Sequence, residues 1–380
     1  MNSPHLTACK GLLGRTECQA LRGLAILGIA LHNYCHWLGS AVKENEYQFF
    51  RANVEGLEHV LASPDGLLPV HLLSFFGHYG VPVFLFLSAY GLTMKYEQSL
   101  DTTASPRQKD ARAGAFIRYH FLKLFRMMIV GFVAFTMIDA ITPGQHAYQV
   151  MDIVAQMGMF NNLLPSPDRI IWPGPYWFFG LMLQLYIVYR LLLFRRHWSV
   201  TVALMLVCTV IQLCCGPESE ALNRWRYNFV GGMLPFGAGL LYARYGRRLT
   251  SWRDDVGHMR FDTLHLLVAS VLILVLSTHY VGWYFVPLCV CSASIACVRI
   301  VMATRWLSVA AKALTWTGSV SAALFVCHPI SRKIFIPISR HGDVYTGLLL
   351  YAIASLCLAW LFAEVMRKIP RPTLKTPQEP

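Results

Sequence analysis

Residues 20–39 read ALRGLAILGIALHNYCHWLG, an apolar stretch interrupted by a few strongly polar side chains. Twenty helical residues rise about 30 Å, which matches the hydrocarbon core of a bilayer. The chain of 380 residues is 55% hydrophobic and 14% charged, whereas soluble domains have about 25% charged residues. So few charges cannot cover the surface of a soluble fold of this size. The composition therefore indicates a polytopic membrane protein and argues against an ordinary soluble enzyme.

Similar apolar stretches recur along the whole chain. We expect ten transmembrane helices, near residues 20–39, 70–94, 121–140, 175–194, 198–215, 228–245, 262–280, 281–301, 313–334 and 345–366. The stretch 148–164 is short and amphipathic, which favours a surface or re-entrant helix. The predicted fold class is all-α, a polytopic membrane helix bundle. It forms one domain over residues 1–380, with a cytoplasmic N-terminal segment 1–19 and a cytoplasmic tail 367–380.

The distribution of charge predicts the orientation in the membrane. The net charge is +13, and with the N-terminus inside, 25 of the 33 Lys and Arg residues fall on the inner side. This asymmetry follows the positive-inside rule, so both termini are predicted to be cytoplasmic. The basic residues are scattered over many short loops, which argues against a nucleic-acid partner.

Polar side chains in the first span are the first candidates for chemistry. Arg22 lies near its inner end, and His32, Asn33 and His36 lie farther out. Ionisable groups inside a membrane usually face a cavity or a partner. Alternatively, Arg22 snorkels to the inner interface and the histidines bond neighbouring helices. At about 100° per residue, Arg22 and His32 point roughly 80° apart, whereas Arg22 and His36 are only about 40° apart.

Other predicted spans place polar groups at a similar depth. These groups are His78, Gln184, Tyr186 and His328. Four histidines in the outer half of the bilayer, the two of the first span included, indicate a wet cavity with acid–base capacity. The eleven cysteines form no CxxC pair, so we expect neither a metal site nor a permanently bound cofactor.

The inner side has a basic feature of its own. Residues 116–128, FIRYHFLKLFRMM, place Arg118, Lys123 and Arg126 at the start of the third span. They are either an interfacial anchor or a binding site for a phosphate-rich ligand from the cytoplasm. Trp177 falls at an outer interface, where an aromatic belt is the usual role and stacking on a sugar is the alternative.

Five segments resemble the acyltransferase type 3 family of bacterial membrane proteins. ECQALRGLAILGIALH is similar to its first-helix signature, GVPVFLFLSAYGL to its second-helix segment, and FIRYHFLKLFRMM to its basic third-helix entrance. PYWFFGLMLQLYIVY and SVSAALFVCHPI resemble its Trp-containing helix and its late His-Pro helix. The order of the five segments, along nearly the whole chain, carries the resemblance.

The resemblance implies transfer of an acyl group, usually acetyl, from cytoplasmic acyl-CoA as cosubstrate to a hydroxyl of an envelope glycan or lipid-linked sugar. It implies the bacterial cytoplasmic (inner) membrane as the location. It also implies an arginine-assisted CoA site, to which Arg118, Lys123 and Arg126 correspond, and a histidine base. Nine residues separate Arg22 from His32, where the family usually has ten. Either a local helix irregularity restores the common face, or His36 is the base.

Two other functions remain open at this point. A polar cavity with a basic mouth also suits a transporter or flippase for a glycan or lipid-linked sugar. A non-catalytic scaffold or sensor would leave the buried histidines unexplained. Membrane lipids are expected partners under each interpretation.

Overall fold

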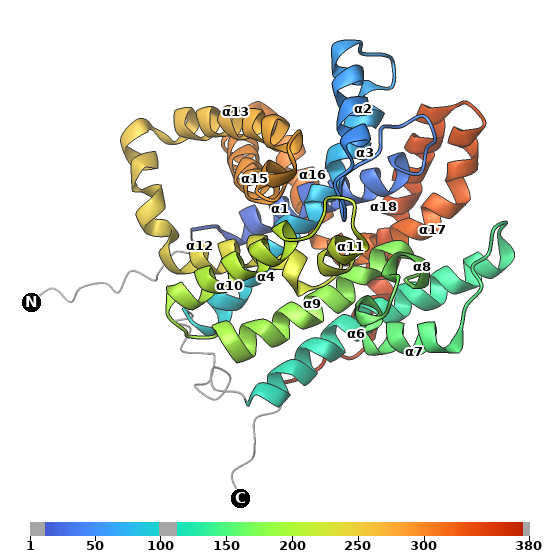
Figure 1. Ribbon diagram of the computed structural model, residues 1–380, viewed down its shortest axis with the longest axis horizontal. Coiled ribbons are helices and arrows are strands. Elements are labelled where there is room, and N and C mark those ends of the chain that lie inside the picture. Colours follow the sequence, from blue (N-terminus) through green and yellow to red (C-terminus); the bar gives the residue numbers. More distant parts are fainter. Residues whose placement is uncertain (1–11, 99–111, 375–380) are drawn as a thin grey trace, which may run out of the picture.

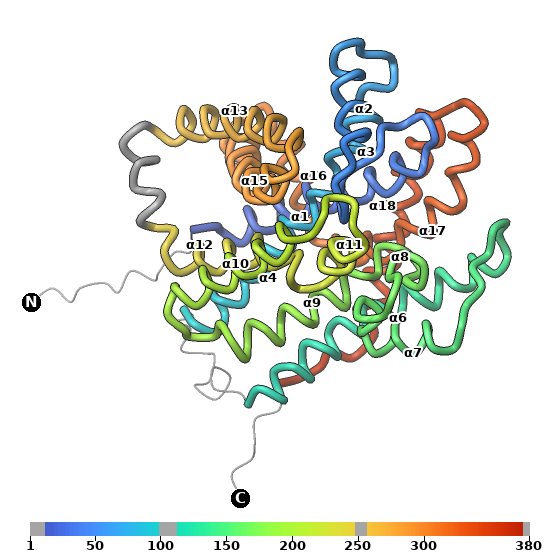
Figure 2. The backbone as a smooth tube through the Cα atoms, viewed as in Figure 1, coloured from blue at the N-terminus to red at the C-terminus, as the bar shows by residue number. Residues whose placement is uncertain are grey.

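The computed structural model describes residues 12–98 and 112–374, with side chains outside 248–256. The predicted tail and N-terminal segment therefore lie partly outside the described residues. Every regular element in these ranges is helical, which confirms the all-α prediction. In Figures 1 and 2, α2 (Arg51–Ala62) and α3 (Leu68–Phe76) project from one edge of the bundle.

The long helices form the body of the molecule. They are α1 (Arg15–Cys35), α4 (Gly80–Tyr96), α6 (Ala113–Ile141), α9 (Trp177–Val188), α10 (Trp198–Leu213), α12 (Phe229–Val256), α13 (His258–Ser277), α15 (Val286–Ala303), α16 (Ser308–Ser319), α17 (Ser321–Arg340) and α18 (Val344–Lys368). Helix α1 packs against α3, α4, α15, α16 and α17. Helices α13 and α15 lie side by side, as do α17 and α18 (Figure 1).

Shorter elements connect the long helices. They are the 3₁₀ turns η1 (Gly77–Tyr79), η2 (Asn161–Leu163), η3 (Gly174–Tyr176) and η5 (Arg305–Leu307), the π-helical turn η4 (Tyr189–Leu193), and the short helices α7 (Val150–Gly158), α8 (Pro167–Ile170), α11 (Glu220–Arg226) and α14 (Tyr280–Trp283). Turn η1 joins α3 to α4, and turns η3 and η4 flank α9. His78 of η1 and Gly174 and Pro175 of η3 line the pocket described below.

Several helices are long and apolar enough to cross a bilayer. Six helical segments of the described chain meet this criterion: Leu68–Tyr96, Ala113–Ile141, Gly174–Leu193, His258–Ser277, Val286–Ala303 and Val344–Lys368. Each corresponds to one of the ten predicted spans. Helices α1 and α12 carry more polar or glycine residues and α10 is shorter, so those three spans stay predictions.

The predicted span 313–334 is wrong as a single straight helix. Helix α16 ends at Ser319, α17 begins at Ser321, and the two axes are bent by 83°. The bend lies beside a close helix crossing, where a Cβ on Gly318 would lie 1.8 Å from the backbone oxygen of Gln19 on α1. The hydroxyl of Ser321 donates to the Gly318 carbonyl and so satisfies an acceptor that the break leaves free.

Helix α7 accounts for the amphipathic stretch predicted at 148–164. It has nine residues, far fewer than a span needs. Its buried side holds Ala155 and Gln156, whereas Val150 and Val154 are 80% and 50% exposed. A short helix with an exposed apolar side suits the boundary between lipid and water.

Candidate active site

Two stacked histidines lie at the C-terminal end of α1, His32 in its last turn and His36 at its C-cap. The His32 and His36 rings lie 4.8 Å apart between centroids, as expected for residues one helical turn apart. His32 is 3% exposed, and its Nδ1 lies 2.8 Å from the backbone oxygen of Ser74 on α3. A carbonyl oxygen accepts only, so Nδ1 carries a proton and donates it. Neutral His32 therefore presents the lone pair of Nε2.

Turn η1 brings a third histidine to this pair. It approaches α1 so closely that a Cβ on Gly77 would lie 2.6 Å from both the Gly28 oxygen and the His32 Cβ. Glycine is therefore required at this crossing. The next residue, His78, is buried with its ring 5.4 Å from that of His32. Among the described residues, neither of its ring nitrogens has a hydrogen-bond partner.

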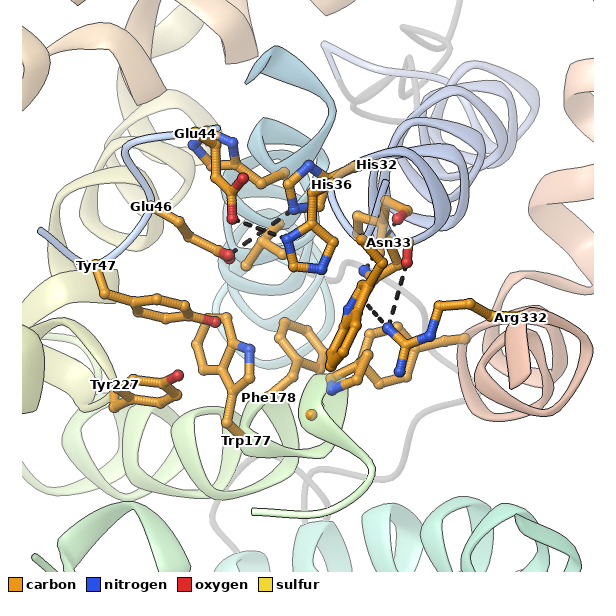
Figure 3. Close-up of a pocket in the computed structure, with 17 residues that line it drawn as sticks. His32, Asn33, His36, Glu44, Glu46, Tyr47, Trp177, Phe178, Tyr227 and Arg332 are labelled. Carbon is orange, nitrogen blue, oxygen red and sulfur yellow. Dashed lines mark hydrogen bonds and ion pairs between the residues drawn. The ribbon is translucent and has the colours of Figure 1, made fainter. Parts of the chain in front are cut away.

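The loop after α1 supplies two carboxylates to the same cluster. Glu44 Oε1 lies 3.0 Å from His36 Nδ1, and Glu46 Oε2 lies 4.0 Å from His32 Nε2 (Figure 3). The loop is anchored from α11 and α14. Arg226 donates to the Glu46 carbonyl at 2.8 Å, and Trp283 Nε1 donates to the Asn45 carbonyl at 2.7 Å. Both carboxylates are thus held over the histidines.

The pKa values of the two carboxyl groups are shifted in opposite directions. Burial opposes ionisation of Glu44, but the hydrogen bond and charge of His36 outweigh it and lower the Glu44 pKa to about 2. Burial, reinforced by the nearby Glu44 charge, raises the Glu46 pKa to about 8. Near neutral pH, Glu44 is ionised and Glu46 holds a proton.

Aromatic and cationic side chains complete the pocket, which has a cavity volume of about 130 Å³. Trp177 and Phe178 of α9 form one wall, beside the parallel rings of Tyr47 and Tyr227, which lie 4.0 Å apart. Arg332 of α17 also lines the pocket and is 6% exposed (Figure 3). Arg332 donates to the Asn33 carbonyl at 3.3 Å and lies 4.8 Å from the centre of the Trp37 ring.

The family model of an acyltransferase domain matches residues 17–364, which is nearly the whole chain. The chain belongs to this acyltransferase type 3 family. The resemblance inferred from the motifs is thereby confirmed, and with it a membrane acyltransferase of this general kind. No curated protein and no solved structure gives a significant match.

Three of the four predicted histidines, His32, His36 and His78, meet in this pocket. The fourth, His328 on α17, lies one layer behind it. Its ring centre is 6.1 Å from that of Phe325, which lines the pocket. His328 is fully buried, and its Nδ1 lies 3.1 Å from the Leu324 oxygen. This places His328 behind the wall of the pocket.

Gln184 and Tyr186, the other two polar residues predicted at the depth of the histidines, do not line the pocket. The Gln184 amide joins α9 to α12, donating to Asn228 Oδ1 at 2.8 Å and accepting from the Phe229 amide at 2.9 Å. The Tyr186 ring lies 4.3 Å from that of His120 on α6. Gln184 therefore has a packing role in the acyltransferase, and Tyr186 belongs to a separate cluster.

The predicted basic entrance lies toward the other end of α1. Helix α1 is regular from Arg15 to Cys35, so the suggested irregularity is absent and Arg22 is about 15 Å from His32 along the axis. Arg22 and Lys123 are exposed, and their like charges lie close enough to repel each other. Arg118 is also exposed on α6, and the partly buried Arg126 has an unpartnered Nε among the described residues.

Proposed function

We propose that this chain is an acyl-CoA-dependent O-acyltransferase that moves an acyl group, acetyl in the first instance, to a sugar hydroxyl of an envelope glycan or lipid-linked sugar. The bond between His32 Nδ1 and the Ser74 carbonyl carries this proposal. It leaves the Nε2 lone pair directed into the pocket, which is the arrangement of a general base. His36, whose Nδ1 is bound to Glu44, is the second candidate for this role.

The proposed transfer is direct and needs no covalent enzyme intermediate. His32 Nε2 takes the proton of the acceptor hydroxyl, and the hydroxyl oxygen attacks the thioester carbonyl carbon. A tetrahedral oxyanion forms, and Arg332 supplies positive charge in the same pocket. The new C–O bond stays, the C–S bond breaks, and the proton passes from His32 to the CoA thiolate.

The two substrates are proposed to approach from opposite sides. The CoA phosphates are proposed to bind near Arg22, Arg118, Lys123 and Arg126. Arg22 of α1 lies close enough to Lys123 of α6 for their charges to interact, and Arg118 and Arg126 lie on the same helix as Lys123. About 15 Å of α1 then separates this region from His32, and the pantetheine arm spans that interval. The acceptor sugar stacks on the aromatic wall beside Trp177. The location is the cytoplasmic membrane of a bacterium, with membrane lipids around the bundle.

A transport function is the alternative with a different readout. Purified protein in liposomes, given acetyl-CoA labelled in the acetyl group and an envelope glycan fraction, should release free CoA thiol in step with acceptor labelling. A flippase would instead move glycan across the bilayer without acyl-CoA and release no thiol. Movement of unmodified glycan with no labelling would therefore overturn the proposal.

A further inference from the structure

The pocket holds a set of side chains suited to a metal ion. The candidate ligand atoms of His32, His36 and Glu44 all lie within 4.8 Å of one another. His32 and His36 are four residues apart on one helix, the spacing with which a single helix face offers two imidazoles to zinc. Glu44 comes from the following loop and adds an anionic oxygen (Figure 3).

The surroundings of this set are arranged as around a metal ligand. The Nδ1 of His32 donates to the Ser74 carbonyl, and metal-bound histidines commonly donate their other ring N–H to a carbonyl or a carboxylate. Nε2 is therefore oriented toward the cluster. Among the described residues, Glu44 Oε2 is a buried atom without a hydrogen-bond partner, and so are both ring nitrogens of His78. Buried polar atoms usually have partners, so these point to a ligand.

We propose that His32, His36 and Glu44 form a binding site for a divalent transition-metal ion of the zinc class. Two imidazoles and a carboxylate are a ligand set that zinc uses with an open fourth position, and imidazole disfavours Ca²⁺ and Mg²⁺. Ligand bonds of about 2.1 Å in a tetrahedron place ligand atoms about 3.4 Å apart. The 3.0 Å between His36 Nδ1 and Glu44 Oε1 is close to this value, and the candidate ligand atom of His32 lies within 4.8 Å of both.

The position of the ion makes it an inhibitor of transfer. This consequence rests on the proposed function, because the ion would occupy the Nε2 lone pair that takes the acceptor proton. Zinc on the outer side of the membrane would then compete with the acceptor hydroxyl for His32. The sequence predicts no metal site because it has no CxxC pair, whereas this site uses imidazole and carboxylate groups.

Zinc binding is tested directly, without either substrate. Purified full-length protein in detergent is dialysed against micromolar Zn²⁺, and its metal content is measured. We expect one zinc per chain in the wild type and in His279→Gln, a control at an exposed histidine. We expect its loss in Glu44→Gln and, as a second variant should that one fail to fold, in His36→Gln. When Co²⁺ replaces zinc, the visible absorption of tetrahedral cobalt should appear in the wild type and in His279→Gln, and not in the other two variants.

Two results would overturn the site: no stoichiometric zinc in the wild type, or binding by folded Glu44→Gln and His36→Gln as tight as in the wild type. Inhibition is tested separately by adding Zn²⁺ to the transfer assay. Transfer by the zinc-loaded wild type at an undiminished rate would overturn the inhibitory role alone. Zinc binding without any transfer in metal-free protein would overturn the proposed function and leave the site intact.

Discussion

His32 is held in one orientation by a neighbouring helix. The Ser74 carbonyl of α3 accepts from Nδ1, and the His36 and His78 rings contact the His32 ring on two sides. A base that is fixed before substrate binds needs little reorganisation during the reaction. The same packing keeps Nε2 beside Glu46. The chemistry that we propose therefore depends on contacts from three separate segments of chain.

Arg332 is expected to stabilise the transition state. Replacing it with Gln removes the charge but keeps a polar side chain beside Asn33. We predict a loss of about 10²-fold in kcat, in the range found when one oxyanion donor is removed, with a small change in KM for acyl-CoA. The matched control is Arg340→Gln, an exposed arginine on the same helix. Equal kcat values in the two variants would contradict the role of Arg332.

The sequence predicted the pocket histidines but not their charged partners. Histidines within apolar spans are conspicuous because burial without a partner is costly. Glu44 and Glu46 lie in a polar loop, and hydropathy does not say where a loop folds back. The sequence does contain one indication of these partners: Glu44 and Glu46 lie eight and ten residues after His36, directly after the histidine-bearing span.

At the scale of elements, close helix crossings shape the site. Apolar composition is similar on both sides of Val320, so the sequence predicted one span where α16 and α17 meet at 83°. Beside the bend, Gly23 and Gly318 let α1 and α16 touch through their backbones. Contacts between segments distant in sequence leave little trace in local hydropathy. Gly23 and Gly318, the two glycines of this crossing, were the only sequence feature that could have indicated it.

The crossing of η1 and α1 offers a test of this geometry. Gly77→Ala places a Cβ against Gly28 and His32, so we predict destabilisation of about 1–3 kcal/mol together with reduced transfer, because His78 and His32 are displaced. Gly91→Ala in α4 is the matched control, since its Cβ would meet nothing within 4 Å. Thermal unfolding in detergent and the transfer assay measure both effects. Indistinguishable variants would contradict the tight crossing.

At the scale of the whole molecule, the charge asymmetry predicts which loops face the cytoplasm. Gly342 lies in the turn between α17 and α18 on the predicted outer side, and Arg305 lies after α15 on the predicted inner side. With the native cysteines replaced by Ser, Gly342→Cys should react with a membrane-impermeant maleimide in intact spheroplasts. Arg305→Cys should react only after permeabilisation. The reverse labelling pattern would invert the proposed topology and the proposed directions of substrate approach.

His32 is the base in the proposed transfer, and the roles of the other pocket residues depend on it. The decisive measurement is kcat for acyl transfer by His32→Gln, beside His36→Gln and the wild type, at equal amounts of folded protein. We predict a fall of about 10²–10⁴-fold for His32→Gln, a much smaller fall for His36→Gln, and unchanged binding of acyl-CoA in both. Wild-type turnover by His32→Gln would contradict the mechanism.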